Sequence, residues 1–169
     1  MGKFTAEEIK RIITEWAKDK AAQGEIEFDE SFCDGVIVRY KTTAMTTIIP
    51  NNPDGETSGF HGKSGLDRTD HYAYEIECQT NVLNLLLAFS YTNISDETKK
   101  TCELLLEKYK MMPKRDVAGN DNFRRLCIYS DEKIKDCKEE SEIRDAMDKL
   151  LYQMKGYEAF VIYKLKEES

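Results

Sequence analysis

The stretch HYAYEIECQTNVLNLLLAFSY, residues 71–91, is the most apolar and most strand-like part of this 169-residue sequence. Its first half alternates between an apolar and a polar set of side chains. The apolar set is Tyr72, Tyr74, Ile76 and Cys78, and the polar set is Glu75, Glu77 and Gln79. Because successive side chains of a strand point to opposite faces, the alternation predicts a strand with one buried and one wet face.

The second half of the stretch, residues 82–91, is almost continuously apolar. Such a run is typical of a strand that is covered on both faces, although a buried helix has the same short-range pattern. Thr80 and Asn81, between the halves, suit a two-residue turn but lack the glycine of the strongest hairpin turns. We therefore interpret residues 71–91 as the central hairpin of a sheet.

The N-terminal segment has the signals of an amphipathic helix over residues 6–22. Thr5 and Glu8 fit a capping box, and Phe4 and Ile9 fit the hydrophobic staple that accompanies it. Apolar residues then repeat at helical spacing, at Ile9, Ile12, Ile13 and Trp16. Trp16 is therefore expected in the core, and Gly24 is expected to follow the end of the helix.

Two further strands are predicted before residue 50. Residues 25–32 alternate apolar and acidic side chains, Asp34-Gly35 is a strong hairpin turn, and residues 36–49 continue as a strand that Pro50 ends. After the central hairpin, the predicted elements are a helix from Ser95 to Pro113, a polar connection at 114–122, a strand at 123–130 and a helix from Ser141 to Gly156.

Residues 157–165 are rich in aromatic and β-branched residues and favour a last strand over a continued helix. The order is then α-β-β-β-β-α-β-α, with that optional final β. This order predicts one α+β domain over residues 1–169, with a mainly antiparallel sheet of about five to six strands and about three helices.

Composition narrows the functional classes. The net charge of −7 disfavours non-specific nucleic-acid binding. The five cysteines include no C-x-x-C pair, which predicts reduced thiols and no metal site. No apolar run is long enough to cross a membrane, and the first residues lack the apolar region of a signal peptide, so we expect a cytoplasmic protein without membrane contact.

Residues 50–71 contain four glycines and two prolines and predict a long flexible loop. The sequence GKSG at 62–65 does not complete a phosphate-binding loop, because Thr57 stands where that motif needs glycine. We expect the loop to contact a partner protein through Phe60, His61, Lys63, Asp67, Arg68 and His71. No cofactor is predicted. The alternative is a hydrolase-type site around the only two histidines, His61 and His71.

A second alternative starts from the order of elements, whose α-β-β-β-α-β part resembles the PD-(D/E)XK nucleases in layout. That chemistry needs an acidic residue and then an E-x-K triplet on the next strand. Here Glu75 and Glu77 are followed by the uncharged run LNLLLAF, so the resemblance implies a degenerate nuclease-like fold without its active site.

Residues 108–125 could still contact nucleic acid, since they hold four more basic than acidic residues with aromatics between them. The candidate contacts are Lys114, Arg115, Arg124 and Arg125. The opposing interpretation is a basic helix end followed by a solvated turn. The first hypothesis is a non-enzymatic protein-binding domain of the inhibitor, immunity or adaptor type. The alternatives are a nucleic-acid-associated protein and a hydrolase.

Overall fold

The hairpin predicted at residues 71–91 is the middle of a five-stranded antiparallel sheet in a computed structural model, which describes residues 3–110 and 117–168. Strands β2 (Tyr72–Cys78) and β3 (Leu83–Ser90) pair along their full length. The other strands are β1 (Ile37–Tyr40), β4 (Val117–Asn120) and β5 (Phe123–Asp131). The strand order is β1-β2-β3-β5-β4.

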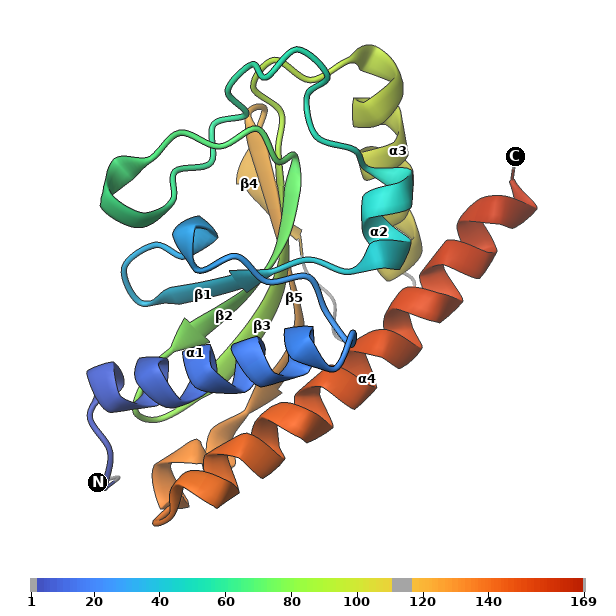
Figure 1. Ribbon diagram of the computed structural model, residues 1–169. Helices are drawn as coiled ribbons and strands as arrows, with labels where there is room; N and C mark the ends of the chain where they lie inside the picture. The colour runs from blue at the N-terminus through green and yellow to red at the C-terminus, as the bar shows by residue number, and fades with distance from the viewer. Residues whose placement is uncertain (1–2, 111–116, 169) are drawn as a thin grey trace.

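Three main helices and a short one complete a single α+β domain, as predicted. They are α1 (Ala6–Ala22), α2 (Thr43–Ile48), α3 (Asp96–Lys110) and α4 (Glu140–Glu167). Single 3₁₀ turns lie at Glu30–Phe32, Lys63–Gly65 and Glu132–Asp136. The helices cover one side of the sheet, whereas the long loop between α2 and β2 lies on the other side (Figure 1).

The core lies between the sheet and the helices. The apolar set of alternating side chains predicted for β2 points into this core. Tyr74 and Ile76 there pack beside Leu87 and Leu85 of β3. Trp16 of α1 is 1% exposed and donates its indole hydrogen to Asp148 of α4 at 2.9 Å. The capping box of Thr5 and Glu8 forms as predicted. All five cysteines are free thiols.

The predictions of two strands before residue 50 were wrong over much of the length of each strand. Residues 25–32 make only one isolated bridge, between Glu27 and Lys41, because the Asp29 side chain caps the 3₁₀ turn that follows. The strand predicted over 36–49 ends at Tyr40. The Thr42 hydroxyl accepts a hydrogen bond from the Met45 amide and starts α2, so a local cap prevailed over the strand preference of the threonines.

The C-terminal predictions also need correction. Residues 157–165 continue α4 and form no strand, because the helical stripe of buried residues runs past Gly156 to Val161. Glu139 caps this helix together with Glu142, so it begins before Ser141. Part of the connection predicted over 114–122 is the edge strand β4, which pairs with β5. Within the described residues, no helix is long and apolar enough to cross a membrane.

Candidate functional site

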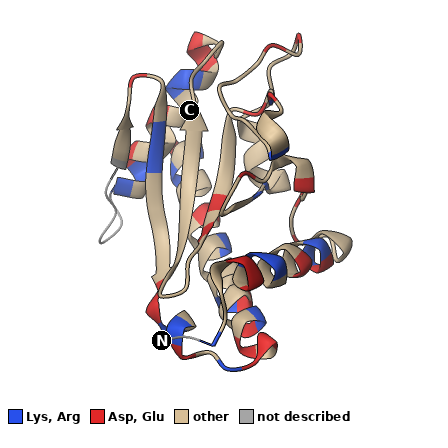
Figure 2. Cartoon of the chain, turned by 90° about the vertical axis from the view of Figure 1, so that its left-hand side faces the viewer, with Lys and Arg blue, Asp and Glu red and all other residues tan. Residues whose placement is uncertain are grey.

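The side of the sheet turned away from the helices carries a row of charged residues. The register places Arg39 of β1 opposite Glu75 of β2, and Arg125 of β5 opposite Ala88 of β3. All of these side chains have the parity opposite to the core residues. Figure 2 looks at this side, where the strands lie in view and few of their residues are charged. The charged row is therefore a local feature of strands that are otherwise mainly uncharged.

Glu75 is the centre of this row and is shared by two arginines. Its side chain is 1% exposed, and its Oε2 accepts a 2.7 Å hydrogen bond from Nε of Arg39. Nε of Arg125 lies 3.1 Å from Oε1 of Glu75, but Oε1 has no hydrogen-bond partner among the described residues, so this contact is a charge contact with poor hydrogen-bond geometry. Two guanidinium groups thus face one carboxylate, and the row has an excess of positive charge.

Arg39 is held from several directions. One of its Nη atoms donates to the carbonyl oxygens of Phe32 at 3.1 Å and His61 at 2.7 Å. The guanidinium carbon lies 5.4 Å from the ring centre of Phe32 and 5.1 Å from that of Phe60, within the range of cation–π attraction. Arg39 is therefore a fixed structural charge. Arg125, with 37% of its side chain exposed, is the arginine that a ligand can reach.

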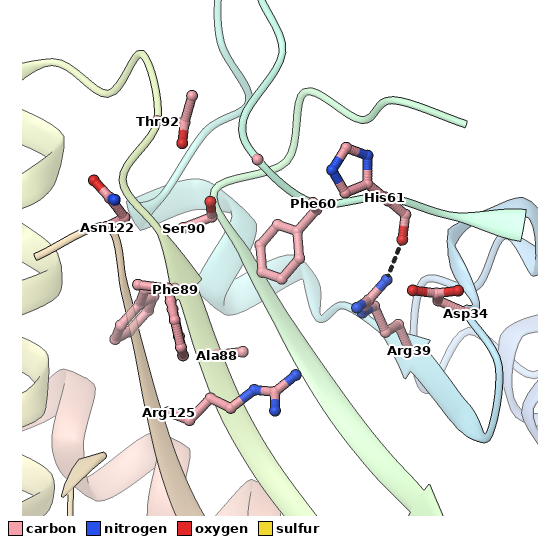
Figure 3. Close-up of a pocket in the computed structure, with 12 residues that line it drawn as sticks. Asp34, Arg39, Phe60, His61, Ala88, Phe89, Ser90, Thr92, Asn122 and Arg125 are labelled. Atoms are coloured by element: carbon pink, nitrogen blue, oxygen red, sulfur yellow. Dashed lines mark hydrogen bonds between the residues drawn. The ribbon is translucent and has the colours of Figure 1, made fainter. Parts of the chain in front are cut away.

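A pocket of about 300 Å³ opens beside Arg125. Its lining combines apolar and polar residues, which are Asp34, Arg39, Gly59, Phe60, His61, Ala88, Phe89, Ser90, Thr92, Asn122, Phe123 and Arg125. Figure 3 shows the Phe60 ring extending from the long loop toward Ala88, with the Arg125 guanidinium reaching in from β5. The alanine side chains of Ala73 and Ala88 leave room on the sheet, where Phe32 and Phe60 form a small second core.

The long loop is packed against the sheet at several points. A Cβ atom on Gly59 would come within 2.6 Å of the Ser90 hydroxyl, and one on Gly62 would meet the carbonyl oxygen of Ser31. His71 is 2% exposed, and its Nδ1 lies 2.8 Å from the carbonyl oxygen of Ser90. These contacts position Phe60 and the carbonyl group of His61 over Arg39.

The residues predicted as partner contacts are placed differently from one another. Phe60 is 8% exposed and lines the pocket. His71 is buried, where desolvation lowers its pKa. Lys63 is exposed in a 3₁₀ turn. Nδ1 of His61 lies 3.0 Å from the carboxylate of Asp67, and both of these side chains are exposed.

Arg68 belongs to an ion-pair network that ties the end of the loop to its neighbours. Its guanidinium contacts Asp70 at 3.0 Å and Asp29 at 3.2 Å, and Asp70 also contacts Lys41 at 3.0 Å. The two histidines have separate partners: Asp67 for His61, and Ser90 and Asn52 for His71. The hydrolase alternative, which needs both histidines in one site, stays a prediction.

The basic segment is also divided. Arg124 and Arg125 are consecutive in β5 and therefore point to opposite faces of the sheet. Arg125 lies in the pocket, whereas Nε of Arg124 lies 3.8 Å from Glu103 of α3. Lys114 and Arg115, the other predicted nucleic-acid contacts, lie outside the described residues. The described residues of this segment, 108–110 and 117–125, do not form a continuous basic surface.

Glu75, which the nuclease comparison singled out, lies between two arginines. In residues 3–110 and 117–168, no group of three or more His, Cys, Asp and Glu side chains could hold a metal ion. Sequence reasoning missed Arg39 altogether. The available signal was a charged residue inside the apolar run VIVRY, which is unusual in a strand unless the charge is paired.

Comparison of the chain with protein-family models, with curated proteins and with solved structures found no match in any of the three.

Proposed function

We propose that this chain is a protein-binding domain that uses the open face of its sheet. The pocket receives an apolar side chain of the partner, and Arg125 binds an acidic group next to it. Such a domain acts by contact, as an inhibitor, immunity or adaptor protein does. The single observation that carries this proposal is the position of Arg125. Its side chain is 37% exposed beside a pocket that has apolar lining residues, and its one ion-pair partner among the described residues is the shared carboxylate of Glu75.

The charge of Arg125 supports an acidic partner group. Within the described residues, Glu75 is its one ion-pair partner, and Glu75 already accepts a hydrogen bond from Arg39. A guanidinium binds a carboxylate through two parallel hydrogen bonds, which fixes both the position and the orientation of the ligand. An aspartate, a glutamate or a chain-terminal carboxylate of the partner would supply this group.

The apolar part of the pocket supports an accompanying hydrophobic residue. Phe60 and Ala88 form part of its lining, and Phe123 at its rim is 40% exposed. A pocket of about 300 Å³ is at the small end of ligand sites and fits one large side chain. Buried aromatic or aliphatic anchors of this kind supply much of the energy of protein interfaces.

Selection from a displayed library of random peptides tests the proposal with a defined probe. We expect enriched peptides to contain an acidic residue close to an aromatic or large aliphatic one. Ala88→Trp fills the pocket and should abolish binding of these peptides, and Arg125→Ala should weaken it by about tenfold or more. Arg124→Ala is the matched control, because this neighbouring arginine points to the other face and should leave binding unchanged.

The same variants distinguish protein binding from nucleic-acid binding. If no peptide is enriched, or if Ala88→Trp binds the enriched peptides as well as the original protein does, the proposal is wrong. A labelled single-stranded oligonucleotide should not bind. Binding that falls steeply with salt and is lost in both Arg124→Ala and Arg125→Ala would support the nucleic-acid alternative instead.

A further inference from the structure

The outer face of α4 carries a row of exposed aromatic residues far from the open face of the sheet. Tyr152 is 78% exposed, Phe160 is 47% exposed and Tyr163 is 60% exposed. Together with Gly156, these residues repeat every three or four positions and therefore lie on one side of the helix. We call this row the aromatic stripe. Large apolar side chains gathered on one exposed helix face mark an interaction surface.

We propose that the aromatic stripe binds the same stripe of a second copy of this chain, with the two α4 helices antiparallel and crossing at Gly156. The inference is independent of the function proposed for the open face. Figure 1 shows α4 along the outside of the domain, with its C-terminal part extending away from the sheet. A second copy can therefore approach this helix along its length.

The spacing of the stripe is self-complementary. Tyr152 lies four residues before Gly156, and Phe160 lies four residues after it. A two-fold axis through Gly156 therefore sets Tyr152 of each copy opposite Phe160 of the other. A Cβ atom on Gly156 would meet none of the described residues within 4 Å, so the backbone is open at this point and a second helix can come close. Ala159, also exposed, is the second small residue at the crossing.

Charge favours the antiparallel arrangement over the parallel one. The exposed residue Lys149 lies on the same helix face, just beyond the N-terminal end of the stripe. An antiparallel pair crossing at Gly156 sets Lys149, seven residues before the crossing, opposite Tyr163 of the other copy, seven residues after it, where a cation–π contact can form. A parallel pair would bring Lys149 against Lys149 and would align the two helix dipoles. Between Tyr152 and Tyr163 the stripe carries no charge, since Lys155 turns away to Glu25.

The size of the surface predicts a weak, reversible dimer. The three aromatic side chains expose roughly 400 Å² on each copy, judged from their exposed fractions and the usual area of such side chains. A total below about 1,200 Å² places the interface at the weak end of specific complexes. The dimer should therefore form and dissociate with concentration.

Sedimentation equilibrium of the full chain tests the association. We expect the average mass to rise with concentration from 19.6 kDa toward twice that value. Phe160→Lys should keep the protein monomeric at every concentration, whereas Leu66→Lys, which changes an exposed apolar residue on the long loop, should still dimerise. A mass that stays at the monomer value up to ~1 mM, a concentration at which even a weak specific dimer is populated, overturns the proposal.

Oxidative cross-linking tests the geometry. Gly156→Cys lies on the two-fold axis and should form an interchain disulfide, because the two Cα atoms come within the range that a disulfide spans. Lys149→Cys should not, because the two cysteines would lie about 20 Å apart along antiparallel helices. A cross-link through Lys149→Cys would show parallel helices and contradict the proposed arrangement. A protein that dimerises but forms no cross-link through Gly156→Cys would also contradict it.

Discussion

Nε of Arg39 donates a 2.7 Å hydrogen bond to Oε2 of Glu75 on the face of the sheet turned away from the helices, yet both side chains are almost fully buried. The long loop and the 3₁₀ turn at Glu30–Phe32 enclose the pair, and Phe32 and Phe60 flank the guanidinium. This pair joins the sheet to the loop that covers it, and it holds the carboxylate that faces Arg125.

Arg39→Ala should lower the free energy of unfolding by about 3–5 kcal/mol, because it leaves Glu75 buried with only a poorly aligned partner. Urea unfolding followed by tryptophan fluorescence measures the change. Arg125→Ala is the control, since its exposed side chain pairs weakly and its loss should cost about 1 kcal/mol or less. Equal losses in the two variants would mean that the two arginines support Glu75 equally.

Glu158 should make the free energy of unfolding depend on pH, and comparison with a Glu158→Gln variant isolates this contribution. Its side chain is buried in the core, where Oε2 accepts hydrogen bonds from Thr42 and Tyr74 at 2.8 and 2.5 Å. Burial raises the pKa of Glu158 above 4.5, and the hydrogen bonds from Tyr74 and Thr42 partly oppose this shift. The folded protein therefore holds the proton more tightly than the unfolded chain does.

The contribution of Glu158 to stability is therefore full below pH 4.5 and is lost as the pH rises through its folded pKa. We expect Glu158→Gln to gain stability relative to the original protein over that range. Urea unfolding at a series of pH values measures the difference, and Glu7→Gln on the exposed face of α1 controls for the loss of one charge. A difference that stays constant from pH 4 to pH 7, the range in which a raised carboxyl group titrates, would contradict the expectation.

Limited trypsin digestion tests the mobility predicted for residues 50–71, which stays a prediction. Cleavage after Lys63 should come first, because this residue is exposed in a single 3₁₀ turn. Cleavage after Arg68 should be slow, since its ion pairs with Asp70 and Asp29 hold it against the domain. Asp70→Asn should accelerate the second cut, and mass spectrometry of the fragments identifies each one. Early cleavage after Arg68 in the original protein would show that the network does not hold this end of the loop.

Local sequence signals predicted the parts of this fold that depend on residues close together in the sequence. The capping box of Thr5 and Glu8 marked α1, and the alternation in residues 72–78 marked β2. Glu75 was correctly placed on the face opposite the core. Its burial could not be predicted, because the residues that cover it come from the 3₁₀ turn and the long loop. The pairing of Arg39 with Glu75 likewise depends on strand register between distant segments.

The glycines at positions 62 and 156 should respond in opposite ways to the same substitution. Gly156 lies inside α4 with open space around it, and Gly62 packs against the backbone of Ser31. Gly156→Ala should raise the free energy of unfolding by about 0.5–1 kcal/mol, because alanine loses less backbone entropy in a helix. Gly62→Ala should lower it, because the new methyl group would displace the loop from the 3₁₀ turn.

Urea unfolding of both variants at low protein concentration, where the chain is monomeric, measures the two changes without a contribution from association. The slope of the unfolding free energy against urea should stay the same in Gly156→Ala, since the surface exposed on unfolding is unchanged. Loss of stability in Gly156→Ala would mean that α4 does not run as a regular helix through this position. Residues 157–165 would then form the strand that their aromatic and β-branched residues favour, in place of the continued helix.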